Sequence, residues 1–240
     1  MIGHNCFEDS MTRDEIEKLV QSAAESQLWT RGTDSYDIDK IGFLAAGVTS
    51  AAYAQRMMRK TPRISNGLSL LAFALAQAPQ DGMILEFGVA SGRTINFIAD
   101  QRPKQVFGFD TFTGLPEDWR AGYPRGAFAT QSLPTVRDNV VLIKGLFEHT
   151  LPEFCTQHED TVAFAHIDCD IYSGAQTILA HLRDRIVPGT VLVFDEYFNY
   201  PDWEMHEFRA FQEFVGAYSR SYEYIGIVAH HQQVAVRILK

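Results

Sequence analysis

The sequence predicts an α/β protein built on a doubly wound, mostly parallel seven-stranded sheet, with an antiparallel strand near the C-terminus and a helical cap before the sheet. From Met83 onward, short apolar segments alternate with helical segments, which is the pattern of parallel strands joined by crossover helices. Two glycines, Gly88 and Gly92, follow the first apolar segment. The last two apolar segments are joined by a short connection at His230 and His231, which predicts an antiparallel pair.

Three helical segments precede the first strand. Residues 12–15 read Thr-Arg-Asp-Glu, a capping-box pattern that opens a helix running toward Leu28. A second helix is expected over residues 37–59, and a third over residues 67–78, ended by Pro79. Because these helices come before the sheet, we expect them to form a cap or an oligomer surface. The alternative is that they pack on their own sheet.

The elements of the sheet follow in order. The strands are expected at residues 83–87, 105–109, 140–144, 162–167, 190–194, 222–228 and 233–239, with helices at 93–101 and 173–185. The connection 111–138 is rich in glycine, proline and aromatic residues, and it is too long for a simple crossover. Loops of this size in compact domains are often functional. We therefore divide the chain into residues 1–66, a helical cap or dimerisation segment, and residues 67–240, the α/β domain.

Composition narrows the class of protein. A chain of 240 residues with 46% hydrophobic residues can bury a sizeable core. A formal charge of −9 argues against a nucleic-acid partner. No apolar run approaches the ~20 residues of a membrane span, and the N-terminus lacks a secretory signal pattern. Cys6, Cys155 and Cys169 are sparse and form no Cys-x-x-Cys pair. They indicate reduced thiols and a cytoplasmic protein, with Cys169 a buried, inert thiol.

The segment after the first strand carries the clearest functional pattern. It reads Glu86-x-Gly88-x-x-x-Gly92, and Asp110 closes the second strand 18 residues after Gly92. Small residues let the backbone approach a ligand, and the start of the next helix offers free N–H groups to a carboxylate. A carboxylate at the end of the second strand can take the hydroxyls of a ribose. The Gly-x-Gly-x-x-Gly spacing of NAD enzymes is absent, so the pattern favours S-adenosylmethionine.

The predicted cofactor site extends around this turn. We expect the Glu86 carboxylate to act on the cofactor's ammonium group, directly or through the loop. Phe147, after the third strand, is expected to flank the adenine, with core packing as the alternative. The alternative interpretation of residues 88–92 is a tight strand–helix turn that binds no ligand. The cofactor-binding set is Glu86, Gly88, Ala90, Ser91, Gly92, Asp110, Thr111 and Phe147.

A second group of candidates is acidic. Asp168 and Asp170 follow one central strand, and Asp195 and Glu196 follow its neighbour. The carboxyl ends of such strands share one edge of the sheet, where ligands bind. Converging carboxylates repel one another unless a proton or a cation neutralises them, and oxygen-only ligands favour Mg²⁺ or Ca²⁺. A metal there would lower the pKa of a substrate hydroxyl and orient it. The alternative is that Asp170 and Glu196 are solvated or cap helices.

Two further features have two interpretations each. His166 lies near the end of the fourth strand, where it is either a general base or a hydrogen-bonded core histidine. The segment after Glu196 is rich in aromatic residues, and it either walls a flat acceptor or covers the sheet edge: Tyr197, Phe198, Tyr200, Trp203 and Phe208.

Four motifs together resemble the macrocin O-methyltransferase (TylF-type) family of class I S-adenosylmethionine-dependent methyltransferases. They are residues 86–92, 109–116, 166–172 and 194–197, in family order, and the resemblance covers residues 70–239. It implies the class I methyltransferase fold and its cofactor. It also implies Mg²⁺ held by Asp168, Asp195 and Glu196, as similarly in catechol O-methyltransferase. The family usually has Asp-Asp where this chain has Asp195-Glu196, which keeps an oxygen ligand but moves it by one methylene.

The predicted function is S-adenosylmethionine-dependent O-methylation of a small, natural-product-like acceptor, assisted by Mg²⁺. The catalytic candidates are Asp168, Asp195 and His166, and without a metal Asp168 or His166 becomes the proton acceptor. The expected partners are the small-molecule acceptor and a second copy of the chain in a homodimer, with no nucleic acid and no membrane. The alternatives are an N- or peptide methyltransferase on the same fold, and a non-catalytic nucleoside-binding protein. The sequence does not identify the acceptor.

Overall fold

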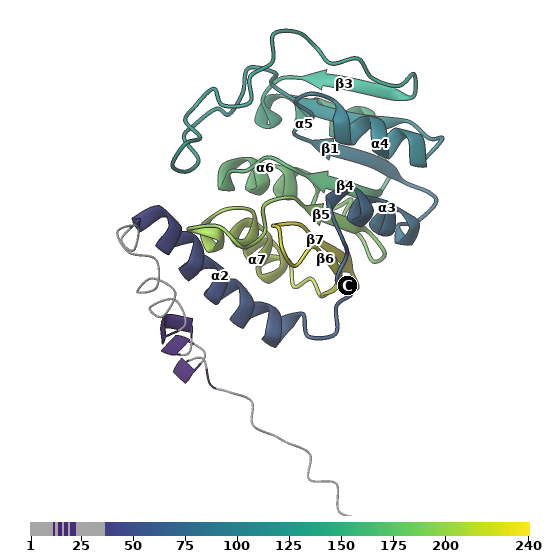
Figure 1. The fold of residues 1–240 in the computed structure, drawn as a ribbon. Coiled ribbons are helices and arrows are strands. Elements are labelled where there is room, and N and C mark those ends of the chain that lie inside the picture. The colour runs from purple at the N-terminus through teal and green to yellow at the C-terminus, as the bar shows by residue number, and fades with distance from the viewer. Residues whose placement is uncertain (1–11, 13, 16, 19, 23–36) are drawn as a thin grey trace, which may run out of the picture. The chain divides into compact units, whose positions relative to one another are not determined.

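A computed structural model describes residues 12, 14, 15, 17, 18, 20–22 and 37–240 (Figure 1). These residues form two compact units. The first contains the described residues up to Arg59 together with Asn199–Pro201. The second contains Lys60–Phe198 and Asp202–Lys240, and it holds the whole sheet.

The first unit is helical. The capping box is formed as expected, because the Thr12 N–H donates to Glu15 Oε2 at 2.7 Å and the Glu15 N–H donates to Thr12 Oγ1 at 3.3 Å. The later part of that expected helix lies outside the described residues. The next helix, α2 (Ile38–Met57), is capped by Asp37, whose side chain accepts from the backbone N–H of Lys40 at 3.1 Å.

The second unit contains a seven-stranded sheet in the order β3-β2-β1-β4-β5-β7-β6. The pairs from β3 to β5 are parallel, and β7 is antiparallel to both of its neighbours, so the predicted mixed sheet is confirmed. Strand addition reverses direction between β1 and β4, which is where doubly wound sheets bind ligands. The strands are β1 (Met83–Phe87), β2 (Val106–Asp110), β3 (Val140–Lys144), β4 (Val162–Ile167), β5 (Val191–Phe194), β6 (Tyr222–Ile227) and β7 (Val234–Ile238).

Helices cover both faces of this sheet (Figure 1). On one face α3 packs beside α4, and on the other face α5, α6 and α7 pack in that order. A short 3-10 helix, η2, precedes α7. The bounds are α3 (Gly67–Gln77), α4 (Arg93–Gln101), α5 (Phe147–Gln157), α6 (Tyr172–Leu182), η2 (Trp203–Met205) and α7 (Glu207–Ala217).

For residues 67–78 the structure shows the alternative, in which the helix packs on its own sheet. Helix α3 buries Leu70, Leu71, Ala74 and Leu75 in the core cluster that also contains Ile84 of β1. These four residues lie one turn apart in pairs, so they form a stripe that faces the sheet. The position of a helix before the first strand in sequence therefore does not decide the layer in which it packs.

The long connection 111–138 is irregular, as its composition indicates, but backbone hydrogen bonds hold it. The Leu115 N–H donates to the Ala127 carbonyl at 2.9 Å. Farther along, Asn96 of α4 fixes the end of the connection, because its Nδ2 donates to the Thr135 carbonyl and its Oδ1 accepts from the Arg137 N–H, both at 2.9 Å. The connection is therefore anchored to the helix that follows the glycine-containing turn.

Two other observations concern the class of protein. Cys155 and Cys169 are free thiols, and Cys6 lies outside the described residues. No described helix combines the length and apolar character that crossing a membrane requires.

Candidate functional site

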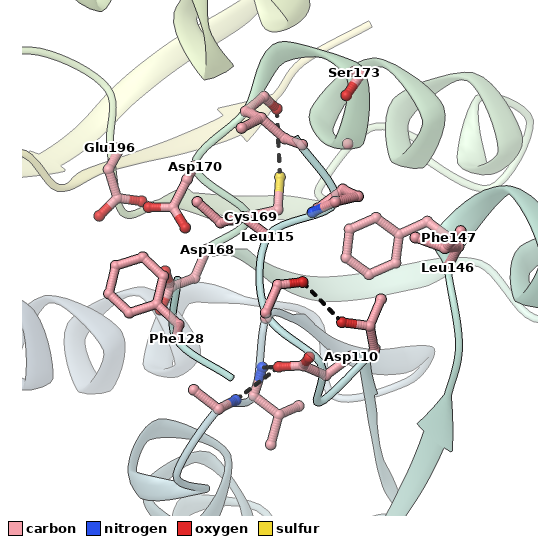
Figure 2. A pocket seen from close by; sticks show the side chains of 18 of the residues that line it. Asp110, Leu115, Phe128, Leu146, Phe147, Asp168, Cys169, Asp170, Ser173 and Glu196 are labelled. Carbon is pink, nitrogen blue, oxygen red and sulfur yellow. Dashed lines mark hydrogen bonds between the residues drawn. The ribbon is translucent and has the colours of Figure 1, made fainter. Parts of the chain in front are cut away.

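A cavity of about 360 Å³ lies where β1, β2 and β4 end (Figure 2). Its walls come from the turn after β1, the first residues after β2, the long connection, the start of α5, and the segments that follow β4 and β5. This size is within the range of small-ligand pockets. The cavity therefore joins the two groups of residues that the sequence singles out.

The turn after β1 requires glycine at its first position. Gly88 has φ +92°, and a Cβ atom there would overlap the carbonyl oxygen of Asp168. The Gly88 N–H donates to the Phe109 carbonyl at 2.9 Å, and the Asp168 N–H donates to the Phe87 carbonyl at 2.8 Å. The turn is thus pressed against the backbone of the segment after β4. Gly92, with φ +79°, precedes α4 and leaves its first N–H groups without a side-chain cap.

Asp110 holds this turn in place. Its Oδ2 accepts from the N–H groups of Val89 and Ala90, both at 2.8 Å, and its Oδ1 accepts from the Phe112 N–H at 2.7 Å. Asp110 also lines the cavity. A carboxylate offers about four acceptor positions, so Oδ1 keeps capacity for a ligand hydroxyl. The expected contact with a ribose remains a prediction beside this role in the turn.

Glu86 is placed differently from its neighbours in the motif. Its side chain is fully buried, does not line the cavity, and lies 2.8 Å from His166 Nδ1 through Oε1. Burial raises the pKa of Glu86, and hydrogen bonds with His166 and Thr94 act in the opposite direction. The structure therefore offers no direct path from this carboxylate to a ligand in the cavity, and only the route through the loop is left for the expected role.

His166 is fully buried between two carboxyl groups and also does not line the cavity. Its Nε2 lies 3.5 Å from Asp195 Oδ1, opposite the Glu86 contact. Burial lowers the pKa of His166, but the hydrogen bonds to Asp195 and Glu86 outweigh burial and hold that pKa well above its ordinary value. The arrangement favours the hydrogen-bonded core histidine over the general base.

The acidic residues form two groups that share Asp168. In one, carboxylate oxygens of Asp168, Asp170 and Glu196 lie within 4.8 Å of one another, and all three residues line the cavity. Figure 2 shows the carboxyl groups of Asp170 and Glu196 directed toward each other. In the other group Asp168 lies with Asp195 and His166, and Asp195 does not line the cavity.

The cavity carboxyl groups are electrostatically strained when all are ionised. Burial and, to a lesser extent, nearby Asp195 raise the pKa of Asp170 to about 7, against the opposing effect of the Arg120 guanidinium. Burial and neighbouring negative charges hold the pKa of Asp168 and of Glu196 well above their ordinary values. Charge at this wall therefore has to be neutralised by protons or by a cation.

Asp195 is held by other partners. Its Oδ2 accepts from Gln233 Nε2 at 3.1 Å, while Oδ1 faces His166. Although burial raises its pKa, the hydrogen bonds and charge of His166 and the bond from Gln233 bring the pKa of Asp195 below its usual value. It is the most readily ionised acid of the two groups.

The donor set fits a hard cation, because the three grouped side chains that line the cavity, Asp168, Asp170 and Glu196, all offer carboxylate oxygens. The residues gathered there differ in part from the expected ligands Asp168, Asp195 and Glu196. Asp170 lies beside Asp168 and Glu196 at the cavity wall, whereas Asp195 does not line the cavity. The signal that could have included Asp170 is its spacing of two from Asp168 after the same strand.

The remaining candidates lie at the other end of the cavity. Phe147 opens α5, lines the cavity and packs edge-on against Phe87 with ring centroids 5.6 Å apart. Ser91 lines the cavity, as does Thr111, whose Oγ1 donates to the Gly114 carbonyl at 3.1 Å.

The lining residues that sequence reasoning did not single out include Phe128 of the long connection and Ser173 of α6. The Ser173 hydroxyl donates to Glu117 Oε1 at 2.7 Å, which links α6 to the long connection. The long connection has no periodic sequence pattern that would place Phe128 or Glu117, and the sequence therefore gives no sign of the bond that brings Ser173 to it.

Comparison with known proteins agrees with this geometry. Residues 85–197 match the family model described as a methyltransferase domain. The chain is similar to the solved structure of CalS11, a calicheamicin methyltransferase, with TM-score 0.56 and 19% identity over 99% of this chain and 98% of that one. It is also similar to the O-methyltransferase NovP, with TM-score 0.56 and 21% identity over 72% of this chain and 79% of that one. No curated protein matches in sequence. The chain has the class I methyltransferase fold, and its central residues 85–197 match a methyltransferase domain.

Proposed function

We propose that this protein is an S-adenosylmethionine-dependent methyltransferase that methylates an oxygen atom of a small acceptor. One observation carries the proposal. A single cavity has a glycine-containing turn and an uncapped helix start at one end and three carboxyl groups at the other. The first end suits an amino-acid and nucleoside ligand, and the second suits the handling of a proton or a cation. The matches to a methyltransferase domain and fold support the same assignment.

The cofactor would occupy the end formed by the turn. The uncapped N–H groups at the start of α4 suit the carboxylate of its amino-acid part. The remaining acceptor capacity of Asp110 suits a ribose hydroxyl, and the Phe147 ring offers an apolar surface to the adenine. Ser91 and Thr111 add hydroxyl groups to the same walls.

The acceptor would lie beside the carboxyl groups. The cofactor's sulfonium supplies the electrophilic methyl group, so the protein has to orient the acceptor, take up its proton and exclude water. Asp168, Asp170 and Glu196 line this end and are the groups available to take the proton. They would also hold Mg²⁺, which when bound would lower the pKa of the acceptor hydroxyl.

The acceptor class is inferred from the walls and from the similar structures. Leu115, Phe128 and Phe147 give the cavity apolar sides that suit a small organic molecule. One similar structure is described as a calicheamicin methyltransferase and another as an O-methyltransferase. By analogy we extend this class, a natural-product-like molecule with a reactive hydroxyl, to the present chain.

Calorimetry with the full chain tests the cofactor assignment. We expect S-adenosylmethionine and S-adenosylhomocysteine to bind with micromolar-scale Kd, on the order of −8 kcal/mol. NAD serves as the control nucleotide. It should give no binding heat, because this sequence lacks the Gly-x-Gly-x-x-Gly spacing of NAD-binding enzymes. Binding of NAD together with no heat from either sulfur compound would refute the proposal.

A further inference from the structure

Glu207, the first residue of α7, makes contacts that the sequence does not foreshadow. Its side chain is fully buried, and it lies outside the cavity wall. Its Oε1 accepts from the backbone N–H groups of Cys169 at 3.1 Å and Asp170 at 3.2 Å. Its Oε2 accepts from the backbone N–H of Glu196 at 3.2 Å. One carboxyl group thus binds the segment after β4 and the segment after β5.

These two segments carry the acidic wall of the cavity. Two of the three N–H groups that Glu207 binds belong to Asp170 and Glu196, whose own side chains line that wall. Asp170 also has φ +65°, a left-handed conformation that a non-glycine residue holds only when its surroundings impose it. The bond from its N–H to Glu207 is a contact that helps to impose it.

The bonds link elements that are otherwise only neighbours in the sheet. The register of β4 and β5 pairs Ile167 with Phe194, and the Asp195 N–H still donates to the Ile167 carbonyl at 3.0 Å, but the residues beyond leave the ladder. A carboxyl group can join them there, because its two oxygens accept from several N–H donors at once. Burial raises the pKa of Glu207 to about 8, although the hydrogen bonds from the N–H groups of Cys169 and Glu196 oppose the shift. The start of a helix also favours a negative group at this position.

We propose that Glu207 is a positioning residue, which sets the placement of Asp170 relative to Glu196 and so shapes the acidic wall of the cavity. The inference rests on the proposed function, because it assumes that this wall completes the cofactor and acceptor site. Glu207 acts through the backbone of the two segments and touches neither ligand. This role requires the full length of the Glu207 side chain, because its two carboxyl oxygens have to contact both segments.

Three variants of the full chain test this role. Glu207→Gln keeps the size of the side chain but turns an N–H₂ group toward a backbone donor. Glu207→Asp keeps the charge and shortens the reach by one methylene. The control is Glu213→Gln on the same helix, since Glu213 is exposed and bonds only to the side chains of Tyr172 and Arg209, at 2.6 and 2.8 Å. Residue-resolved hydrogen exchange and calorimetry with S-adenosylhomocysteine are measured for each.

We expect the amides of Cys169, Asp170 and Glu196 to exchange at least tenfold faster in both Glu207 variants, while the amide of Val193 within β5 keeps its rate. S-adenosylhomocysteine affinity should fall tenfold or more in both variants, because the segment after β4 that Glu207 holds also packs against the turn at Gly88. The control should match the wild type in both measurements. Because Glu207→Asp keeps the carboxyl group and shortens the side chain, faster exchange and weaker binding in that variant would show that the role requires the length of the glutamate side chain.

Other results overturn the inference. Unchanged exchange at the three amides would mean that the bonds do not hold the segments. An equal rise at Val193 would indicate general destabilisation. Faster exchange with unchanged affinity would mean that the placement does not matter to the site. A wild-type protein that binds no S-adenosylhomocysteine would refute the proposed function instead, and the exchange rates would then report Glu207 as a structural tie alone.

Discussion

Gly88 marks the point at which the turn after β1 passes closest to another part of the backbone. Glycine is required there for two separate reasons, its positive φ and the absence of a Cβ next to the Asp168 carbonyl oxygen. Ala90, two residues later, has φ +43° and shows that the turn accepts a side chain where there is space. Both positions have positive φ, but Gly88 also lies against another backbone segment. Substitutions at Gly88 and Ala90 therefore separate the effect of the close approach from that of the backbone conformation.

We predict that Gly88→Ala destabilises the protein by roughly 3 kcal/mol or more, because the turn or the segment after β4 must move. Ala90→Gly should change the free energy of unfolding by less than about 1 kcal/mol, since relief of the left-handed strain offsets the greater freedom of the unfolded chain. Urea denaturation followed by circular dichroism measures both. A Gly88→Ala protein as stable as the wild type would show that the close approach is not maintained in solution.

Asp110 combines a role in the turn with the expected role toward the ribose, and a double comparison separates them. Asp110→Ala should weaken S-adenosylhomocysteine binding by roughly 1.5–3 kcal/mol, through loss of charge-assisted hydrogen bonds. If the carboxylate also contacts the ribose, the wild type should discriminate against an analogue that lacks the ribose hydroxyls, and the variant should not. Calorimetry gives both numbers. If the wild type and the variant discriminate equally between S-adenosylhomocysteine and the analogue, Asp110 stabilises the turn and does not contact the ribose.

At the level of elements, the ends of β4 and β5 gather the acidic residues. Asp168 belongs to both carboxylate groups, and Glu196 and Asp195 each belong to one. We predict weak Mg²⁺ binding, because this ion keeps several of its waters and relies on the substrate to complete its coordination shell. Removal of Asp168 should therefore lower Mg²⁺ affinity more than removal of Asp195 or Glu196.

Calorimetric titration of Mg²⁺ into protein saturated with S-adenosylhomocysteine measures this order. Asp168→Asn should abolish the Mg²⁺ signal, and Asp195→Asn and Glu196→Gln should reduce it. Cofactor affinity should change less than about threefold in each, because these changes keep the side-chain size and leave the backbone bonds of both segments to Glu207 in place. The chelator-treated wild type is the reference. If it shows no Mg²⁺ heat, the carboxyl groups serve as a base or as a structural cap.

The elements that the sequence predicts best are those whose pattern is local. β1, β3, β4 and α4 occupy the predicted residues, because each is a compact apolar or amphipathic run. Two helices, α5 and α7, were not predicted. Helix α5 contains Pro152, which removes a backbone donor inside the helix, and α7 follows an aromatic segment that resembles a loop.

The sequence predicts where the backbone segments of the site lie better than it predicts which partners the side chains contact. The turn at Gly88 and the acids Asp168 and Glu196 line one cavity, as their places at strand ends indicate. Glu86 could not be placed, because both faces of a parallel sheet are covered and the sequence does not say which face meets which helix. Glu86 shares the face of Ile84, which packs in the core cluster with α3. The contacts of Glu207 join segments about forty residues apart, beyond the reach of any local pattern.

At the level of the whole molecule, the remaining expectation is a homodimer, and the structure narrows its origin. Helix α3 packs on its own sheet, so among the helices before the sheet that the structure describes in full, α2 is the one to consider. Ile38, Ile41 and Leu44 of α2 are spaced by three residues, so they lie along one face, and they are 80%, 39% and 49% exposed. Contiguous exposed apolar side chains on a helix are typical of association surfaces.

We predict that the full chain associates through this face of α2 and that light scattering gives twice the monomer mass of 27.1 kDa. A double substitution, Ile38→Glu with Leu44→Glu, should give the monomer mass, because two charges would have to be buried at each copy of the interface. Leu239→Glu is the matched control, since Leu239 is 50% exposed but lies in the unit that contains the sheet, and it should remain dimeric. A wild-type mass of one chain at high concentration would remove the dimer. A dimer that persists in the double variant would place the association surface elsewhere on the chain.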